Sequence, residues 1–372
     1  MPSSQFVAKA IFVAMLILSM SAVVSAQSKG LDPVLLAKAK AGDADAEERV
    51  SLSYSRLGNQ KESCRWGFIA AQNGNASAQH YLGYTYEVGS TLCERPKDYT
   101  QAAVWFRKAA EQGDVVSQEE LAVMYDNGQG LPQDHSLAAI WWRKAAEQGD
   151  PSSQYNLGIA YYRGQGLPQD YAQAIIWFRK AAELRQGEIA GAPERSRKIM
   201  EGTTADAQSA LGEAYAYGNG VAQDYGQAAA WYRKAADLGN AYAQRDLGDL
   251  YYNGGVIKFV DAPGGGKRGI RDDGGGDFPK DYSLAATWYR KAAEQGDEYS
   301  QNSLGILYDN GQGVPQDYAE AYFWYSLASA KQPHLAENRD NAASHLTKTV
   351  LLQTQERARK WFEDHPVQTN PQ

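Results

Sequence analysis

Hydrophobic and small residues recur along the chain at two helical spacings. In one type of segment a small residue, Leu, Gly and Tyr stand at spacing 0, 4, 5 and 8, as in Ala78, Leu82, Gly83 and Tyr86. These positions share one face of an α-helix. In the next type, A-x-x-W-x-R-K-A-A, a Trp is followed by alanines four and five residues later. The pattern predicts amphipathic helices that alternate along the chain.

The tryptophan of the second segment sets the repeat length. Successive copies lie 39, 36, 36, 54, 57 and 36 residues apart, so the basic unit has 36 residues. A sequence motif repeated at a fixed period is typical of stacked helix pairs, whereas a catalytic site is needed only once in a chain. We therefore interpret these tryptophans primarily as core residues. The seven copies are Trp66, Trp105, Trp141, Trp177, Trp231, Trp288 and Trp324.

Start and stop signals frame the helices. An Asp precedes each tryptophan-bearing segment except the first one. At that position its carboxylate can accept the free backbone N–H groups of the first helical turn. A Gly follows the alanine pairs at Gly113, Gly149, Gly239 and Gly296 and suits a left-handed C-cap. The predicted N-caps are Asp98, Asp134, Asp170, Asp224, Asp281 and Asp317.

These markers predict a solenoid of about seven helix pairs over 27–332. The units lie near 43–75, 78–114, 115–150, 151–187, 206–240, 241–297 and 298–332, with insertions at 184–206 and 256–279. An apolar stripe that includes Ala343, Leu346 and Trp361 predicts capping helices over 333–366. Such a cap covers the apolar face of the last repeat. Residues 367–372 are predicted to be a disordered tail.

The two insertions carry no recognised catalytic motif. We expect 184–206 to lengthen a helix or to turn the direction of the solenoid. The glycine-rich segment over 256–280 contains GGGKRG but not the G-x-x-x-x-G-K-S/T of a phosphate-binding loop. Its glycine content and mixed charge favour a flexible, disordered loop, and a loop that contacts a partner is the alternative.

The repeated consensus A-Q-x-x-L-G-x-x-Y-x-x-G-x-G-V/L-P-Q-D-Y-x-x-A-x-x-W-Y/F-R-K-A-A-E-Q-G-D resembles the Sel-one-like repeat (SLR) family, a relative of the tetratricopeptide repeat. The resemblance covers about residues 43–330. It implies an all-α fold, a right-handed α/α superhelical solenoid that holds protein partners, often in the bacterial envelope. Some members carry a Cys pair in every repeat and are linked to β-lactam binding, whereas this chain has one pair.

The N-terminus predicts export. Lys9 precedes an apolar run over 10–24, and Val24 and Ala26 put small side chains before Gln27. This is the pattern of a signal peptide over 1–26 that is cleaved near Ala26/Gln27, with an uncleaved anchor as the alternative. The run is shorter than the ~20 residues that span a bilayer. The mature chain would be periplasmic or secreted.

The two cysteines predict a disulfide. An even pair in an exported chain is usually bridged. Cys64 lies near the start of one second helix, and Cys93 lies in the turn before the next one, so both belong to the same end of adjacent helix pairs. Two free thiols are the alternative.

Charge and motifs argue against nucleic-acid binding and catalysis. The chain has 44 acidic and 37 basic residues, a net charge of −7, and cleavage would also remove Lys9. S-x-x-K, G-x-S-x-G and H-E-x-x-H are absent, and the five histidines do not stand in a metal-ligand spacing. We predict no cofactor, no metal, no enzymatic activity, no nucleic-acid partner, and no membrane contact beyond export.

Positions that vary between copies define a candidate binding face. On the first helix of each unit, the residues two before, two after and five after the Leu share one face, turned away from the core. In related superhelices the first helices line the concave side, so exposed Tyr, Val and Ile there predict a partner groove. Contact with the neighbouring repeat is the alternative. The candidates of this groove stripe are His80, Tyr84, Val123, Tyr155, Ile159, Tyr162, Arg245, Tyr252 and Ile306.

Together these patterns predict an exported bacterial envelope protein. It would act as a protein–protein interaction scaffold or adaptor through a concave groove. The alternative is a peptidoglycan or glycan binder that uses exposed aromatic residues. A β-lactam hydrolase or a penicillin-binding activity is less favoured, because the motifs are missing.

Overall fold

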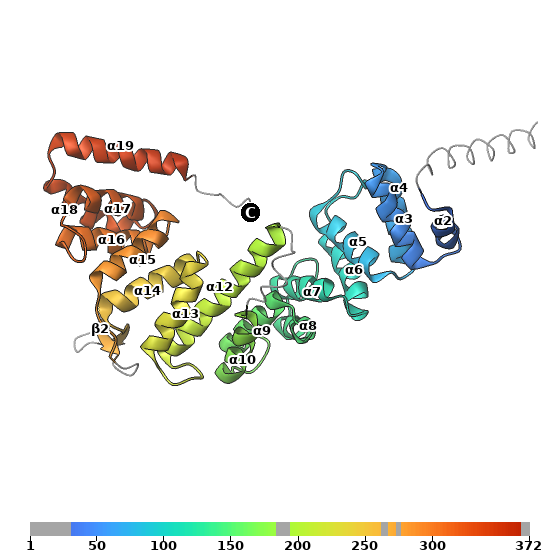
Figure 1. Cartoon of the computed structure of the whole chain (residues 1–372), viewed down its shortest axis with the longest axis horizontal. Helices are drawn as coiled ribbons and strands as arrows, with labels where there is room; N and C mark the ends of the chain where they lie inside the picture. The colour runs from blue at the N-terminus through green and yellow to red at the C-terminus, as the bar shows by residue number, and fades with distance from the viewer. Residues whose placement is uncertain (1–30, 184–193, 262–266, 273–276, 366–372) are drawn as a thin grey trace, which may run out of the picture. The chain divides into compact units, whose positions relative to one another are not determined.

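The chain divides into two compact units, Met1–Gln148 and Gly149–Gln372. Figure 1 shows the computed structural model, which describes residues 31–183, 194–261, 267–272 and 277–365. The predicted signal peptide and the predicted tail lie outside these residues. Each unit consists of helices that pack against their neighbours in sequence.

The first unit is a series of antiparallel helix pairs (Figure 1). α3 packs on α4, α5 on α6 and α7 on α8, and α4 and α6 also contact the helix that follows. Apart from α2 these helices are each 13 residues long. Their bounds are α2 Pro33–Lys40, α3 Ala44–Arg56, α4 Gln60–Gln72, α5 Ala76–Val88, α6 Tyr99–Glu111, α7 Val115–Asn127 and α8 His135–Glu147.

The second unit continues the helix pairs and ends in two further helices. α17 contacts both α18 and α19, and a short 3₁₀ turn at Pro333–Leu335 joins α17 to α18. The bounds are α9 Pro151–Arg163, α10 Tyr171–Ala181, α12 Glu194–Tyr217, α13 Tyr225–Asp237, α14 Ala241–Asn253, β1 Val256–Asp261, β2 Lys267–Asp272, α15 Tyr282–Glu294, α16 Glu298–Asn310, α17 Tyr318–Lys331, α18 Ala336–Ser344 and α19 Lys348–Asp364.

Local signals explain where the helices begin and end. All six predicted Asp residues are N-caps; the Asp98 carboxylate, for example, accepts the backbone N–H groups of Thr100 and Gln101 at 2.9 and 3.1 Å. The four predicted stop glycines follow the second helices with φ between 89° and 98°. Side chains rarely adopt that backbone region, so glycine is the residue that fits.

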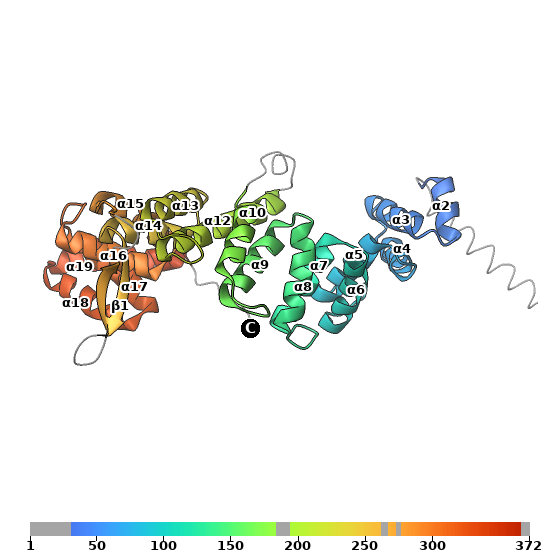
Figure 2. The ribbon, with the colours of Figure 1, turned by 90° about the horizontal axis from the view of Figure 1, so that it is seen from below.

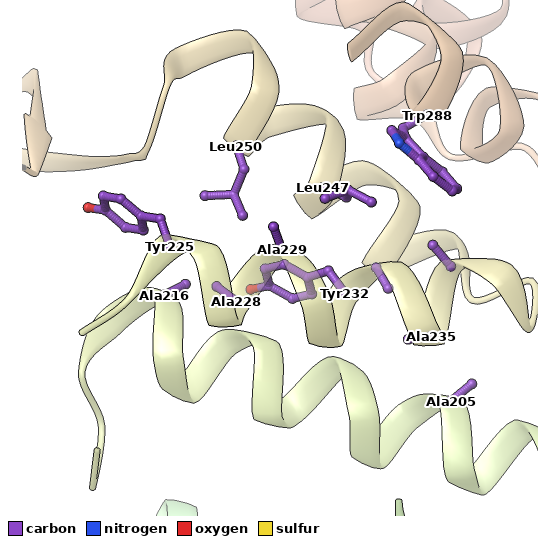
Figure 3. Packing of buried hydrophobic residues seen from close by; sticks show 12 residues of the cluster. Ala205, Ala216, Tyr225, Ala228, Ala229, Tyr232, Ala235, Leu247, Leu250 and Trp288 are labelled. Carbon is purple, nitrogen blue, oxygen red and sulfur yellow. The ribbon is translucent and has the colours of Figure 1, made fainter. Parts of the chain in front are cut away.

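In the core, an aromatic ring of one helix packs directly against a glycine of the neighbouring helix. A Cβ added to Gly212 of α12 would lie 2.5 Å from the ring of Tyr232, and one added to Gly248 of α14 would lie 2.7 Å from the ring of Tyr289. Figure 3 shows the buried cluster in which Tyr232 packs, with Leu247 facing the alanines of α13. The predicted core role of the repeat tryptophans also holds, because Trp105, Trp177, Trp288 and Trp324 are buried and the other three are half-buried.

The insertion over 184–206 lengthens a helix, one of the two expected outcomes. α12 starts at Glu194 and runs for 24 residues, against 13 for most first helices. Its last turns occupy the place of a normal first helix and pack against α13.

The glycine-rich insertion differs from the flexible loop that we expected. Two of its stretches, β1 and β2, pair as an antiparallel hairpin with Val256 opposite Asp272 and Asp261 opposite Lys267. Figure 2 shows β1 near the helices of the second unit, and β1 contacts α14. The sequence VIKFVD is rich in β-branched and aromatic residues, which favour strands. The all-α class stands, with this hairpin added to it.

Candidate binding face

The groove stripe lies on the first helices of the repeats and is mostly half-buried. Among its nine candidates Tyr84 is exposed, at 43% of its surface, whereas the other eight are half-buried. We expected these side chains to be exposed. Because α-helices of adjacent pairs lie side by side, one surface of each residue packs against a neighbour while the other faces solvent.

In the first unit the stripe connects neighbouring repeats. The His80 ring packs 5.7 Å from the ring of Phe106, and its Nδ1 lies 3.0 Å from Ser117 Oγ of α7. Burial lowers the pKa of His80, and the nearby Asp114 carboxylate opposes that shift. Tyr84, one turn further along α5, is the member of the stripe that a partner could reach most readily.

In the second unit Tyr155, Ile159 and Tyr162 pack against a buried cluster that includes Phe178. The Tyr162 hydroxyl donates to Glu213 Oε1 at 3.1 Å and accepts from Asn219 Nδ2 at 2.7 Å, so it links α9 to α12 and to the turn that follows. The pKa of Tyr155 is raised to about 12, mainly by burial and to a smaller extent by the negative charge of the nearby Asp206. These three half-buried side chains therefore help to hold the helices together in addition to forming part of the surface.

Three further stripe residues contact neighbouring helices or their N-caps. Arg245 of α14 forms an ion pair with Asp297, with Nη1 3.3 Å from Oδ2. The Tyr252 ring packs edge-on against Tyr282 of α15, with centroids 5.3 Å apart and an interplanar angle of 68°. Ile306 packs against the cluster that includes Tyr322 and Tyr325.

A small cavity opens between two first helices of the second unit. It has a volume of about 200 Å³ and is lined by Tyr217 of α12, Tyr232 of α13, and Asp246, Asp249 and Asn253 of α14, together with Leu250 and the start of β1. We call it the acidic cavity. Asp246 is 29% exposed and its Oδ1 accepts from Arg245 at 3.2 Å. Asp249 Oδ1 accepts from the Tyr289 hydroxyl at 2.6 Å.

Both carboxyl groups of the acidic cavity hold protons more tightly than usual. Burial raises the pKa of Asp246 to about 7; Arg245 opposes that shift and Asp249 adds to it. Burial also raises the pKa of Asp249, against the hydrogen bond from Tyr289 and the charge of Arg245. The charge of Arg245 is therefore too weak to offset the effect of burial on these two carboxyl groups.

Three recurring interactions had no role in the sequence interpretation. The Gln of A-Q-x-x-L-G is buried, and Gln118 Nε2, for example, donates to the Ala110 carbonyl at 3.1 Å. The Arg of W-x-R-K reaches the next repeat, as Arg233 does to the Tyr251 hydroxyl at 2.8 Å. The Lys covers the tryptophan of its own helix, as in the pair Lys108 and Trp105, 4.2 Å apart. Their recurrence in most copies was the available signal.

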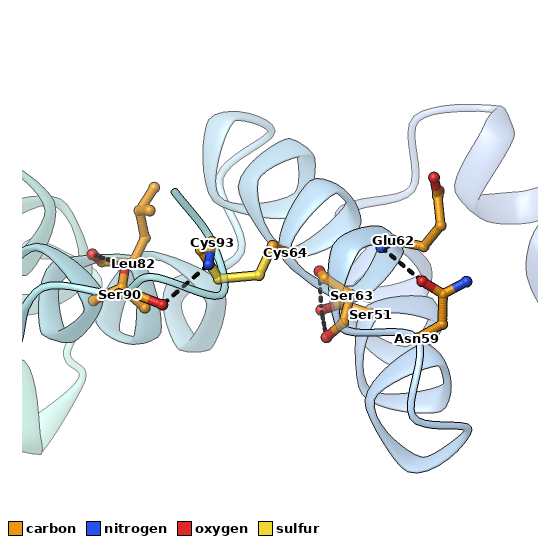
Figure 4. Close-up of a disulfide and its surroundings, with 9 residues drawn as sticks. Ser51, Asn59, Glu62, Ser63, Cys64, Leu82, Ser90 and Cys93 are labelled. Atoms are coloured by element: carbon orange, nitrogen blue, oxygen red, sulfur yellow. Dashed lines mark hydrogen bonds between the residues drawn. A yellow bond between two sulfur atoms is a disulfide. The ribbon is translucent and has the colours of Figure 1, made fainter. Parts of the chain in front are cut away.

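A disulfide joins Cys64 of α4 to Cys93 of the loop before α6 (Figure 4). The Cα atoms are 5.5 Å apart, within the range that a bridge requires. The Cys93 backbone N–H donates to Ser90 Oγ at 3.2 Å, which orders the loop around the bridge. Within the described ranges neither thiol is free.

Within the part of the chain that the structure describes, no group of three or more His, Cys, Asp or Glu side chains is arranged to hold a metal ion. None of the helices in those ranges combines the length and apolarity that crossing a membrane requires.

The helix pairs, their capping signals and their ring-over-glycine packing define an α-helical repeat protein of the tetratricopeptide-like class. Sequence comparison gives the family: Sel1 repeats match residues 76–114, 115–150, 151–185, 205–240, 241–262, 270–297 and 298–332. The chain belongs to the Sel1 repeat family, whose members generally act as protein–protein interaction scaffolds. The matches at 241–262 and 270–297 are the two halves of the repeat that the hairpin interrupts. The pair α3 and α4 lies before the first match.

A solved structure gives the same class. A Sel1 repeat protein from Oxalobacter formigenes is 25% identical; the match covers 76% of this chain and 96% of that one, with a TM-score of 0.56. A protective antigen of uropathogenic Escherichia coli with an SLR fold is 28% identical, with 90% and 81% covered and a TM-score of 0.40. No curated protein matches the sequence significantly.

Proposed function

We propose that this Sel1 repeat protein is an exported scaffold of the bacterial envelope that binds protein partners along its groove stripe. The observation that carries the proposal is the contrast between positions. Residues that build the stack recur in most copies, whereas the stripe changes from His80 to Tyr155 to Arg245 at the same place in the repeat. Variation at a partly exposed, fixed geometric position is what partner-specific contacts need.

The glycan-binding alternative has less support. Sugars stack on open aromatic faces, but the repeat tryptophans are buried or half-buried, and lysines lie over the rings of Trp105, Trp141, Trp177, Trp231 and Trp288. We propose no catalytic role, and purified protein is expected not to hydrolyse a chromogenic β-lactam. Turnover that scales with the protein in a clean preparation would contradict this.

The proposed location rests on the N-terminal pattern and is consistent with the disulfide. Protein recovered from the periplasm is expected to begin near Gln27 and to resist alkylation of Cys64 and Cys93 until a reductant is added. Retention of residues 1–26 in the mature protein, or modification of both thiols without reductant, would argue against export.

The binding face can be tested with a matched pair of photo-crosslinking positions. Tyr84 of the groove stripe and Val104 on the second helix α6 are both 43% exposed. We replace each separately with a benzoylphenylalanine and irradiate cells that express the full chain. Discrete protein adducts are expected from position 84 and not from position 104. Equal labelling from both positions, or adducts from 104 alone, would contradict the proposed face.

A further inference from the structure

The ring that crosses the glycine changes its chemistry between the two ends of the chain. At this position Phe106, Trp142 and Phe178 are followed, in later repeats, by Tyr232, Tyr289 and Tyr325. The rings pack alike, because a Cβ on the facing glycine would touch each Phe or Tyr at 2.5–2.7 Å. The later repeats therefore add a hydroxyl group to a site whose packing needs only the ring.

The hydroxyl of Tyr232 has no hydrogen-bond partner among the described residues, although Tyr232 is only 3% exposed. Its counterpart Tyr289 has one, Asp249 Oδ1 at 2.6 Å. Since Tyr232 lines the acidic cavity, its polar atom is available to a group that enters the cavity.

The carboxylates of the cavity also have unused acceptor positions. Arg245 contacts Asp246 only through Oδ1, and Tyr289 contacts Asp249 only through Oδ1. In the described ranges the second oxygen of each carboxylate has no hydrogen-bond donor. Arg245 also divides its charge between Asp246 and Asp297, so it offsets only part of the charge of either carboxylate.

We propose that the acidic cavity binds the cationic side chain, Lys or Arg, of an extended segment of a protein partner. This inference rests on the proposed scaffold function and names the chemistry of the partner. An ammonium or guanidinium group has only donors, and the cavity offers carboxylate and hydroxyl acceptors. Tyr217 supplies an aromatic wall, which also attracts a cation. A volume of about 200 Å³ suits one side chain rather than a folded surface.

The test uses the full chain and small probes that differ only in charge. Leu250 and Val256 line the cavity, so their methyl resonances report on its occupancy. We titrate with the Nα-acetyl N-methylamides of lysine and arginine, and with those of norleucine and glutamine as neutral controls. Saturable shifts of these methyl signals are expected with at least one cationic probe and with neither neutral one.

Three variants assign the interaction to named groups. Asp246→Asn and Asp249→Asn each remove one charge and are expected to weaken binding about tenfold or more. Tyr232→Phe recreates the ring of Phe178 and is expected to weaken binding about threefold to tenfold. Asp309→Asn on α16 changes the net charge equally but lies outside the lining of the cavity, so affinity should stay near that of the wild type.

Equal shifts with neutral probes, no saturable shift with either cationic probe, or an equal loss in Asp309→Asn would overturn the inference. Circular dichroism checks that each variant is folded, and Tyr232→Phe keeps the packed ring in any case. The crosslinking at Tyr84 tests the scaffold function on the first unit. Adducts there without cation binding here would therefore reject the cavity proposal alone.

Discussion

At the scale of single residues, a glycine without a Cβ lets an aromatic ring pack closely in most helix pairs. The glycine after the core Leu accepts an aromatic ring at a distance that no Cβ could share, as Gly212 does with Tyr232. Helical glycine is otherwise unfavourable, by about 1 kcal/mol relative to Ala. The chain therefore keeps a poor helix former at most of these positions, although α7 has Ala122 there. The packing argument can be tested within one helix.

Gly212→Ala and Gly202→Ala, both in α12, are expected to have opposite effects. The Cβ at position 212 would meet the Tyr232 ring at 2.5 Å, whereas the one at 202 would meet nothing within 4 Å. We expect Gly212→Ala to lose about 1–3 kcal/mol through overpacking and Gly202→Ala to gain about 0.5–1 kcal/mol. Urea midpoints measure both; a gain in both variants would contradict the packing argument.

The raised pKa of Asp246 gives a pH-dependent prediction. The folded carboxyl titrates at about 7, above its ordinary value near 4, so the folded state holds a proton that the unfolded state has released. Stability is therefore lost as pH rises from about 4 to about 7. Asp246→Asn removes this loss. Because the side chain is partly exposed, we expect the variant to gain on the order of 1–2 kcal/mol relative to the wild type at pH 8.

Unfolding of the wild type and Asp246→Asn at pH 4 and pH 8 measures this difference. The gain of the variant should be much smaller at pH 4, where the folded carboxyl group is protonated and the unfolded one is about half protonated. A gain that is the same at both pH values would show that the effect comes from packing and not from titration.

At the scale of elements, each helix pair is fixed by its caps and tied to the next pair by recurring polar contacts. Asp carboxylates begin the second helices, and Gln118 and Arg233 reach across to the neighbouring element. The first unit adds a covalent link where the loop between α5 and α6 departs from the usual turn. The disulfide there takes the place of the Gly-Pro-Gln-Asp sequence that other repeats use.

The replacement of both Cys64 and Cys93 by Ser is expected to destabilise the chain by about 3–4 kcal/mol, because the bridge closes a loop of 29 residues. The loss should appear as a lower urea midpoint under oxidising conditions. Adding reductant should lower the wild-type midpoint to that of the variant and leave the variant unchanged. A wild-type urea midpoint that does not change when reductant is added would contradict a stabilising role for the disulfide.

At the scale of the molecule, stability is expected to be distributed as a sum over repeats, because helices contact their neighbours in sequence. Trp177 of α10 is 8% exposed, whereas Ile176 beside it is 46% exposed. Trp177→Ala should cost about 3–5 kcal/mol, and Ile176→Ala should stay within about 0.5 kcal/mol.

Amide hydrogen exchange locates this damage. In Trp177→Ala, protection should fall most in α9, α10 and α12 and least in α15–α17 of the same unit. A uniform loss of protection over the whole second unit would show that the unit unfolds as one cooperative block, which is contrary to nearest-neighbour stability.

The sequence by itself determined the features that depend on a few consecutive residues. The 36-residue period, the Asp caps and the stop glycines follow from local spacing and backbone chemistry, so all were predicted correctly. The family followed from the same repeated positions. The hairpin was missed although VIKFVD favours a strand locally, because the surrounding glycines outweighed it in our interpretation.

Only the tertiary structure decided what each surface position contacts. Helical periodicity placed Tyr155, Tyr162 and Arg245 on one face, but it could not show that this face is shared between solvent and the next repeat. The acidic cavity joins Tyr232 of α13 to Asp246 and Asp249 of α14 and to Tyr217 of α12. The exposure and the pKa of these side chains depend on how three separate helices pack. The spacing of residues along one helix does not determine the distances between helices.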